Sequence, residues 1–305
     1  MSDSNPGAFT LGAFALVVIL GGTNFLAVRV SNQELAPFWG AGFRFGLAAV
    51  IFVAIVLFLR LPWPRGRLLF DTVVYGLFSF AVFYALMYWA LVRVTGAMAA
   101  VILALVPLLA PMLAAAQRIE RIERRILIGA LVALGGIVVT TVGASGVVLP
   151  TAGLIAMILA ALAGGQSLIL SKRVSANHPA MSNAIGMLAG AAALLVISAA
   201  VGESWALPTR ASVIVSITYL IILGSVGLFI LTLLVIRHWT VAATSYIFVL
   251  MPVATMVLEW WLLDEPLTSR GVAGAILVMA GVWFGAFSRS APRSRAAEPA
   301  TAETR

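Results

Sequence analysis

Few side chains of this sequence could do chemistry in an apolar setting, and the most informative of them is Arg44. It lies about seven residues into an apolar run over residues 37–59. A charge inside a membrane-like segment is costly, so ionisable residues there usually mark functional sites. We predict that Arg44 contacts an anionic group, such as the carboxylate of a bound small molecule. The competing interpretation is a structural arginine that binds helix-end carbonyls or extends its head group outward.

Glu259 is the one carboxylate that lies more than a turn inside an apolar run, near the end of residues 240–263. We predict that it pairs with Arg44 or takes up a proton in a coupled reaction. The competing interpretation is an interfacial carboxylate, because Trp260 and Trp261 follow it as interfacial aromatic residues do. Glu259 is the one candidate for coupling transport to protons. Facilitated diffusion driven by the substrate gradient is therefore an equal alternative to proton antiport.

Two glycine pairs, each followed by an amide, lie at matching places in the two halves of the chain. Asn24 follows Gly21-Gly22, and Gln166 follows Gly164-Gly165. Paired glycines let helix backbones approach closely, and the amides could then bind a ligand. The competing interpretation is simple helix packing, with each amide bonded to a neighbour.

Tyrosines supply the remaining candidate groups. Tyr84 and Tyr88 are four residues apart and so share one helix face, and Tyr246 lies in a later apolar run. Rings with hydroxyl tips suit a cavity for an apolar or aromatic molecule, although aromatic stripes also occur in helix cores. The predicted binding residues are Asn24, Arg44, Tyr84, Tyr88, Gln166 and Tyr246.

The sequence predicts neither a metal site nor a cofactor. It has no cysteine, and its two histidines, His178 and His238, lie far apart. We find no phosphate-binding glycine loop and no nucleophile motif. The net charge of +8 would suggest nucleic acid in a soluble protein, but no soluble basic domain is present to bind it.

Composition indicates that lipid is the main solvent. The 305 residues are 62% hydrophobic and 10% charged, too few charges to cover a soluble surface. Unbroken apolar runs, each of about the length that a helix needs to cross a bilayer, predict spanning helices rather than barrel strands. The ten predicted spans are approximately 10–30, 37–59, 70–92, 95–117, 125–143, 150–172, 181–201, 211–236, 240–263 and 269–288.

The basic residues predict the orientation of these spans. With the N-terminus in the cytoplasm, fourteen of the 19 lysines and arginines fall on the inner side. Four fall on the outer side, namely Arg29, Arg93, Arg210 and Arg270, and Arg44 lies inside a span. This asymmetry follows the positive-inside rule. We expect a multi-pass protein of a bacterial inner membrane, with both termini cytoplasmic and a disordered tail over 289–305.

An internal repeat appears when the second half of the chain is aligned with the first. Pro107 then falls on Pro252, and Arg125 falls on Arg270. Five spans in each half put the second half in the membrane upside down, which is the architecture of many secondary transporters. The sequence therefore predicts an all-α fold of ten transmembrane helices in two inverted five-helix repeats, at 1–146 and 147–288. Pro107 and Pro252 are predicted to be paired kinks that gate or hinge a central cavity.

Several segments resemble the EamA-type carriers of the drug/metabolite transporter superfamily. The segment LGGTNFLAVRV at 20–30 resembles that family's WGSNF element, with Gly21 where tryptophan is usual, and FRF around Arg44 matches its arginine. The segments at 84–113 and 237–265 resemble its third and fourth spans in each half. The resemblance covers about residues 10–288 and implies a carrier, with amino-acid exporters among the nearest-looking members.

The resemblance and the repeat together favour a secondary transporter of amino acids or similar small metabolites, acting as exporter or facilitator by alternating access. The alternatives are an exporter of drugs or nucleobases and, in a different class, a membrane-embedded enzyme that acts on lipids. The expected partners are a small-molecule substrate and the bilayer. The sequence leaves the oligomeric state open and is compatible with a monomer.

Overall fold

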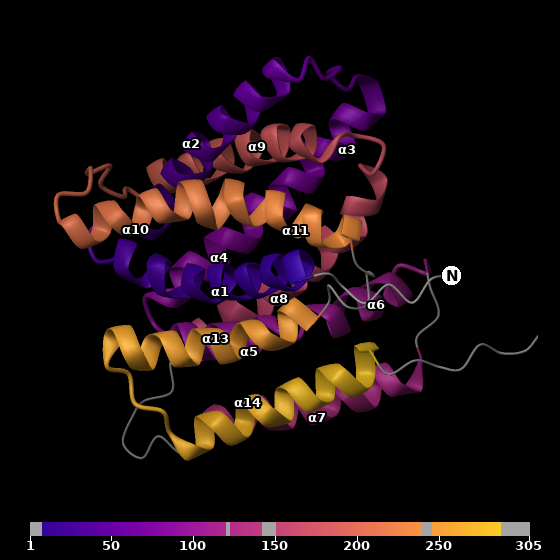
Figure 1. Ribbon diagram of the computed structural model, residues 1–305, viewed down its shortest axis with the longest axis vertical. Helices are drawn as coiled ribbons and strands as arrows, with labels where there is room; N and C mark the ends of the chain where they lie inside the picture. The colour runs from indigo at the N-terminus through magenta and orange to yellow at the C-terminus, as the bar shows by residue number, and fades with distance from the viewer. Residues whose placement is uncertain (1–7, 120–122, 142–150, 239–245, 288–305) are drawn as a thin grey trace, which may run out of the picture.

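The computed structural model describes residues 8–119, 123–141, 151–238 and 246–287, and every regular element within these ranges is helical (Figure 1). In the first half the elements are α1 (Ala8–Ser31), α2 (Pro37–Phe58), α3 (Gly66–Gly76), η1 (Leu77–Val82), α4 (Phe83–Leu91), α5 (Gly96–Leu103), α6 (Val106–Ala116) and α7 (Arg124–Thr141). In the second half they are α8 (Thr151–Arg173), α9 (Pro179–Ala200), α10 (Ala211–Ile221), η2 (Ile222–Gly227), α11 (Leu228–His238), α13 (Tyr246–Leu263), α14 (Ser269–Val282) and η3 (Trp283–Phe287).

Six of these helical segments are long and apolar enough to cross a membrane, or seven if the bent pair α5 and α6 counts as one span. A helix satisfies its own backbone hydrogen bonds, which lipid cannot do, so this architecture suits a bilayer. The predicted all-helical, multi-pass membrane fold is confirmed. The tail at 289–305 and the boundary between 146 and 147 lie outside the described residues.

Equivalent helices of the two halves pack against one another. Helices α2 and α9 form one extensive contact, and helices α7 and α14 form another. Figure 1 shows α7 and α14 lying side by side at one end of the bundle. The first span of each half packs against the fourth: α1 contacts α13, and α8 contacts α6.

The two glycine pairs make equivalent contacts in the two halves. A Cβ atom added to Gly22 would lie 3.1 Å from the backbone nitrogen of Thr255. One added to Gly165 would lie 3.2 Å from the backbone nitrogen of Ala110, the residue that the repeat aligns with Thr255. Both pairs therefore allow a first-span helix to approach a fourth-span helix closely, as small residues do between membrane helices.

Glycines also determine how closely α7 and α14 approach. We expect Gly136→Ala to lower the free energy of unfolding by about 1–3 kcal/mol, because the new Cβ would lie 2.7 Å from the backbone oxygen of Gly274. Gly135→Ala is the matched control, since nothing lies within 4 Å of its Cβ position. That variant gains helix propensity and should be as stable as the wild type or slightly more so. Thermal unfolding in detergent would compare them, and equal losses would contradict this packing.

The third span of each half contains one turn of π-helix. These turns are η1 at Leu77–Val82 and η2 at Ile222–Gly227, and the alignment of the two halves places one on the other, so they occupy equivalent places in the repeat. A π-turn disrupts the usual i to i−4 hydrogen bonding and is frequent at functional sites. Both turns lie beside the cavity described below.

The two prolines differ in their local structure. Pro107 lies in the first turn of α6, where the axes of α5 and α6 bend by 41°. Pro252 lies inside α13, which runs on without a break. The bend expected at Pro107 is thus present, while the gating role of both prolines stays a prediction.

Glu34, in the turn between α1 and α2, joins the two halves of the bundle. It accepts hydrogen bonds from the backbone nitrogens of Arg210 and Thr209, at the N-terminus of α10, and from the Thr209 hydroxyl. The bond from the Arg210 nitrogen contributes most to holding the pKa of Glu34 below its ordinary value. An anion at a helix N-terminus is favourable, so this contact links the α1–α2 turn to α10.

Candidate functional site

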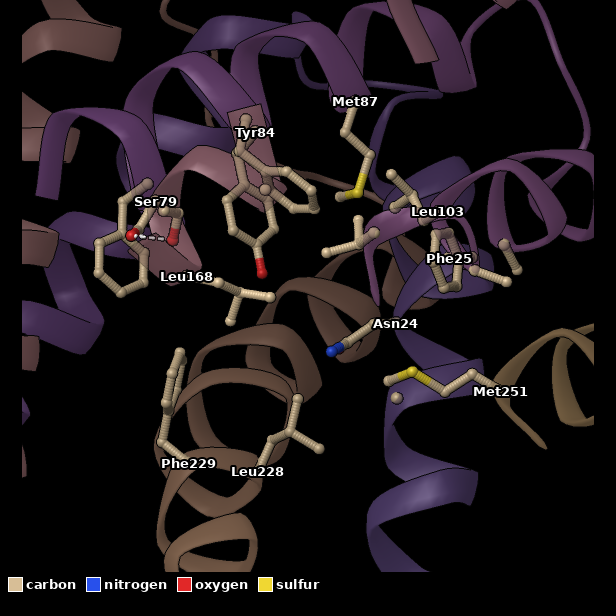
Figure 2. Close-up of a pocket in the computed structure, with 18 of the residues that line it drawn as sticks. Asn24, Phe25, Ser79, Tyr84, Met87, Leu103, Leu168, Leu228, Phe229 and Met251 are labelled. Carbon is tan, nitrogen blue, oxygen red and sulfur yellow. Dashed lines mark hydrogen bonds between the residues drawn. The ribbon is translucent and has the colours of Figure 1, made fainter. Parts of the chain in front are cut away.

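A cavity of about 300 Å³ lies between the two halves of the bundle. Helices α1, α3, η1, α4, α5 and α6 contribute to its wall from the first half, and α8, α11 and α13 from the second half. Six aromatic residues line it, namely Phe25, Tyr75, Phe80, Phe83, Tyr84 and Phe229. Figure 2 shows the Tyr84 hydroxyl and the Asn24 amide directed into this space. Among the described residues that line it, none carries a charge.

Arg44 lies behind this wall and is 1% exposed. Its Nη2 donates to the carbonyl oxygen of Gly224 at 2.9 Å and its Nε to the Ser225 hydroxyl at 3.0 Å. Its Nη1 lies 3.3 Å from the hydroxyl oxygen of Tyr88, and its Cζ lies 5.4 Å from the centre of the Tyr84 ring. In the described part of the chain no carboxylate pairs with Arg44. The site therefore contains a buried cation whose hydrogen bonds all go to neutral oxygens.

The π-turn η2 supplies the oxygens that bind Arg44. The Gly224 carbonyl accepts from Arg44 and also from the Asn24 amide nitrogen at 3.2 Å. The Ser225 hydroxyl donates to the carbonyl of Leu220, five residues back, and accepts from Arg44. Because Gly224 has no side chain, both donors can reach its carbonyl: a Cβ there would collide with the Asn24 amide oxygen.

The predicted binding residues separate into three groups. Asn24 and Tyr84 line the cavity. Arg44 and Tyr88 form the layer behind Tyr84, and both are fully buried. Gln166 does not line the cavity; its amide oxygen accepts from Gln117 at 2.6 Å. The side chain of Tyr246 lies outside the described part of the structure. A substrate-binding role remains a prediction for each of them.

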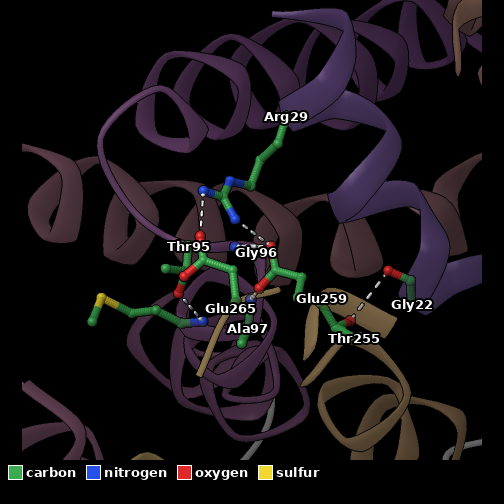
Figure 3. A network of polar contacts seen from close by, with 9 residues as sticks. Gly22, Arg29, Thr95, Gly96, Ala97, Thr255, Glu259 and Glu265 are labelled. Carbon is green, nitrogen blue, oxygen red and sulfur yellow. Dashed lines mark hydrogen bonds and ion pairs between the residues drawn. The ribbon is translucent and has the colours of Figure 1, made fainter. Parts of the chain in front are cut away.

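Glu259 does not pair with Arg44, so that prediction was wrong. Its Oε1 accepts from Arg29 Nη1 at 2.8 Å and from the Gly96 nitrogen at 2.8 Å, and its Oε2 accepts from the Ala97 nitrogen at 2.7 Å (Figure 3). Gly96 and Ala97 begin α5, whose N-terminus attracts an anion. Arg29 lies further along α1 than Asn24 and reaches Glu259 because both lie at the same end of the bundle.

Glu265 completes this charged cluster. It accepts from Arg29 Nη2 at 2.9 Å, so one guanidinium joins two carboxylates of the second half. Glu259 is 1% exposed, whereas the Glu265 side chain is 35% exposed. The cluster links α1, α5 and α13, and we call it the Arg29 cluster.

Several residues of the cavity and the cluster are not marked by the sequence. The sequence predicts for Arg29 only a role in orienting the membrane span. It predicts no binding role for Ser79, Tyr75, Phe80 or Phe229. The one available signal for Arg29 was that it occupies the last turn of a span and so lies level with Glu259. The other four lie in apolar segments in which lipid-facing and inward-facing residues are of the same types. Which of them face the cavity is determined by how the helices pack and cannot be seen in the sequence.

Known proteins resemble this chain over most of its length. An uncharacterized inner membrane transporter of Escherichia coli K12, YedA, is 28% identical over 274 residues, with 88% of each chain covered. A probable amino-acid metabolite efflux pump of Salmonella typhimurium LT2 is 29% identical over 287 residues, covering 89% of this chain and 93% of that protein. One crystal structure matches with a TM-score of 0.63 at 21% identity, over 91% of this chain and 96% of that one.

The apolar helical bundle defines a multi-pass membrane protein with an internal cavity. The model of the EamA-like transporter family matches residues 8–142 and again residues 151–286. The chain belongs to the EamA-like transporter family. Because the family and these relatives are named as transporters, the enzyme alternative is set aside, and the resemblance to EamA-type carriers is confirmed.

Proposed function

We propose that this protein is a secondary transporter that moves amino acids or similar small metabolites across the inner membrane, as an exporter or facilitator. The observation that carries the proposal is the cavity between the two halves, which is lined by aromatic rings and has the buried Arg44 behind its wall. Ligand sites of transporters with inverted repeats lie at such an interface. The named efflux pump of Salmonella supports the same solute class.

The proposed architecture is ten spans in two inverted five-helix repeats, 1–146 and 147–288, with both termini in the cytoplasm. The two family matches, the equivalent helix pairs and the equivalent π-turns support it. The excess of basic residues on the predicted inner side supports the orientation. Transport would proceed by rocking of the two halves, with Pro107 and Pro252 as hinges, and a monomer would suffice.

The proposed substrate is an apolar or aromatic amino acid. Its side chain would lie against the ring faces of the cavity, which also has the size of a small ligand site. Its carboxylate would lie at the Arg44 end, near Asn24 and Tyr84, with Tyr88 holding the guanidinium. A buried cation attracts an anion strongly where water is excluded.

The second candidate is export of drugs or nucleobases. Planar aromatic solutes would also stack on the rings around the cavity, and this lining favours them over sugars. Such solutes would leave Arg44 without an anionic partner, which is why amino acids come first.

Uptake into liposomes that contain only this protein tests the proposal. We expect saturable uptake of labelled phenylalanine that competes with methionine and not with glutamate, because no described lining residue compensates a second negative charge. Empty liposomes give the background. Saturable uptake of a nucleobase with none of phenylalanine would favour the second candidate.

A further inference from the structure

Two serine hydroxyls meet across the helices on one side of the cavity. Ser79 Oγ in η1 and Ser167 Oγ in α8 are 2.6 Å apart, and both residues line the cavity (Figure 2). Hydroxyls in helices often bond the carbonyl one turn back, as Thr72 and Thr140 do in this protein. Ser79 and Ser167 bond each other instead, and so they present oxygens to the cavity.

This serine pair is the repeat-related counterpart of the contact between Asn24 and Gly224. The alignment that places Gly21-Gly22 on Gly164-Gly165 also places Asn24 on Ser167, and the repeat aligns Ser79 with Gly224. In each case a polar group of a first-span helix bonds the π-turn of a third-span helix. The two contacts differ in charge, because only the one at Gly224 includes a guanidinium.

The surroundings of the serine pair favour a cation. Each hydroxyl oxygen has two lone pairs; the bond between the two serines uses one of the four, and the Tyr75 hydroxyl also lies within hydrogen-bonding reach of Ser79. Tyr75, Phe80 and Phe83 line the cavity with them, and the electron-rich faces of such rings attract ammonium groups. Arg44 would repel an ammonium group at the opposite contact, because like charges interact strongly in a low dielectric.

We propose that Ser79 and Ser167, with these three rings, form a subsite for the ammonium group of the substrate. The inference rests on the proposed function and adds to it: the carboxylate lies at the Arg44 end and the ammonium at the serine end. The two repeat-related contacts would then distinguish an amino acid from a simple carboxylic acid. Ser79 and Ser167 are specificity-determining residues in this account.

Binding of two ligands that differ only in the amine tests the subsite. Phenylalanine and 3-phenylpropionate would be titrated against the purified wild type and the S79A/S167A variant, with tryptophan fluorescence as the readout. We expect the variant to bind phenylalanine about tenfold more weakly, since hydrogen bonds to a charged group are lost, and to bind 3-phenylpropionate as the wild type does. Ser171→Ala is the matched control, because Ser171 lies one turn further along α8 and bonds its own helix at Leu168.

The outcomes separate this inference from the proposed function. Equal weakening of both ligands, or none, would overturn the ammonium subsite. If the wild type bound 3-phenylpropionate but not phenylalanine, both the subsite and the amino-acid substrate would be wrong. If it bound phenylalanine with the expected loss in the variant yet moved none into liposomes, the subsite would stand and the transport proposal would fall. Ser167→Thr keeps the hydroxyl and should retain most of the binding.

Discussion

Arg44→Met should reduce phenylalanine transport about 100-fold or more while leaving the protein folded. The substitution removes the cation that we propose attracts the substrate carboxylate, and losing such a partner costs about 3 kcal/mol or more. Methionine fills a similar volume, and no carboxylate is left unpaired, because the bonds that are lost go to neutral oxygens. Initial rates of uptake and thermal unfolding, measured on the same preparation, would check both parts.

Two further variants make this expectation specific. Arg44→Lys keeps the charge but cannot reach Gly224, Ser225 and Tyr88 together, because an ammonium group lacks the planar fork of donors. It should transport at an intermediate rate. Arg93→Met is the control, since Arg93 is exposed and stacks on Trp89 away from the cavity. Wild-type transport by Arg44→Met would instead make Arg44 a purely structural residue.

Much of the fold could be predicted because membrane helices leave strong signals in sequence. Long apolar runs fix the helices, and the internal repeat aligns Gly136 with Gly281 and Pro107 with Pro252. The structure adds what that alignment could not give: Gly136 packs on Gly274 within the α7–α14 contact. Periodicity identifies helices, whereas helix pairing depends on which faces fit together.

The candidate site was less predictable, because its geometry depends on the two π-turns. The sequences LFSFAV at 77–82 and ILGSVG at 222–227 share little, so nothing in them marks a local change of helix type. The second turn provides the carbonyl and hydroxyl that bind Arg44. Polarity and repeat position indicated Asn24 and Arg44 as candidate binding residues. For the second half they indicated Gln166, which bonds Gln117 and does not line the cavity. The residue that lines the cavity at the place equivalent to Asn24 is Ser167.

The partner of Glu259 was misassigned because Arg44 and Arg29 were equally compatible with its position along the chain. Arg44 was interpreted as a buried cation that requires an anionic partner, and Arg29 was interpreted as a residue that orients the membrane span. In three dimensions Arg29 lies level with Glu259, and the N-terminus of α5 supplies two further donors. A carboxylate with three donors is well satisfied, and Arg44 bonds neutral oxygens instead.

Glu259→Ala should have the largest effect on stability. It removes the acceptor of Arg29 and leaves the Gly96 and Ala97 nitrogens unpaired in a buried place. Breaking a buried ion pair from one side costs about 3–5 kcal/mol, which corresponds to a fall in Tm of about 10 °C for a protein of this size. Thermal unfolding in detergent measures it. Glu265→Ala is the matched control, because Glu265 binds the same arginine while partly exposed and should cost about 1 kcal/mol or less.

A second substitution of the same residue tests whether transport is coupled to protons through Glu259. Both oxygens of Glu259 accept hydrogen bonds, and these bonds tie the carboxylate to Arg29 and to the N-terminus of α5. We therefore expect Glu259→Gln to be less stable than the wild type yet to show the same response of phenylalanine uptake to an imposed proton gradient. A wild type that responds to the gradient and a variant that does not would show that the Arg29 cluster opens during transport and that Glu259 carries the proton. An unchanged response in the variant would leave Glu259 with the structural role of joining α1, α5 and α13. If uptake by the wild type also did not respond to the proton gradient, the substrate gradient would be the driving force.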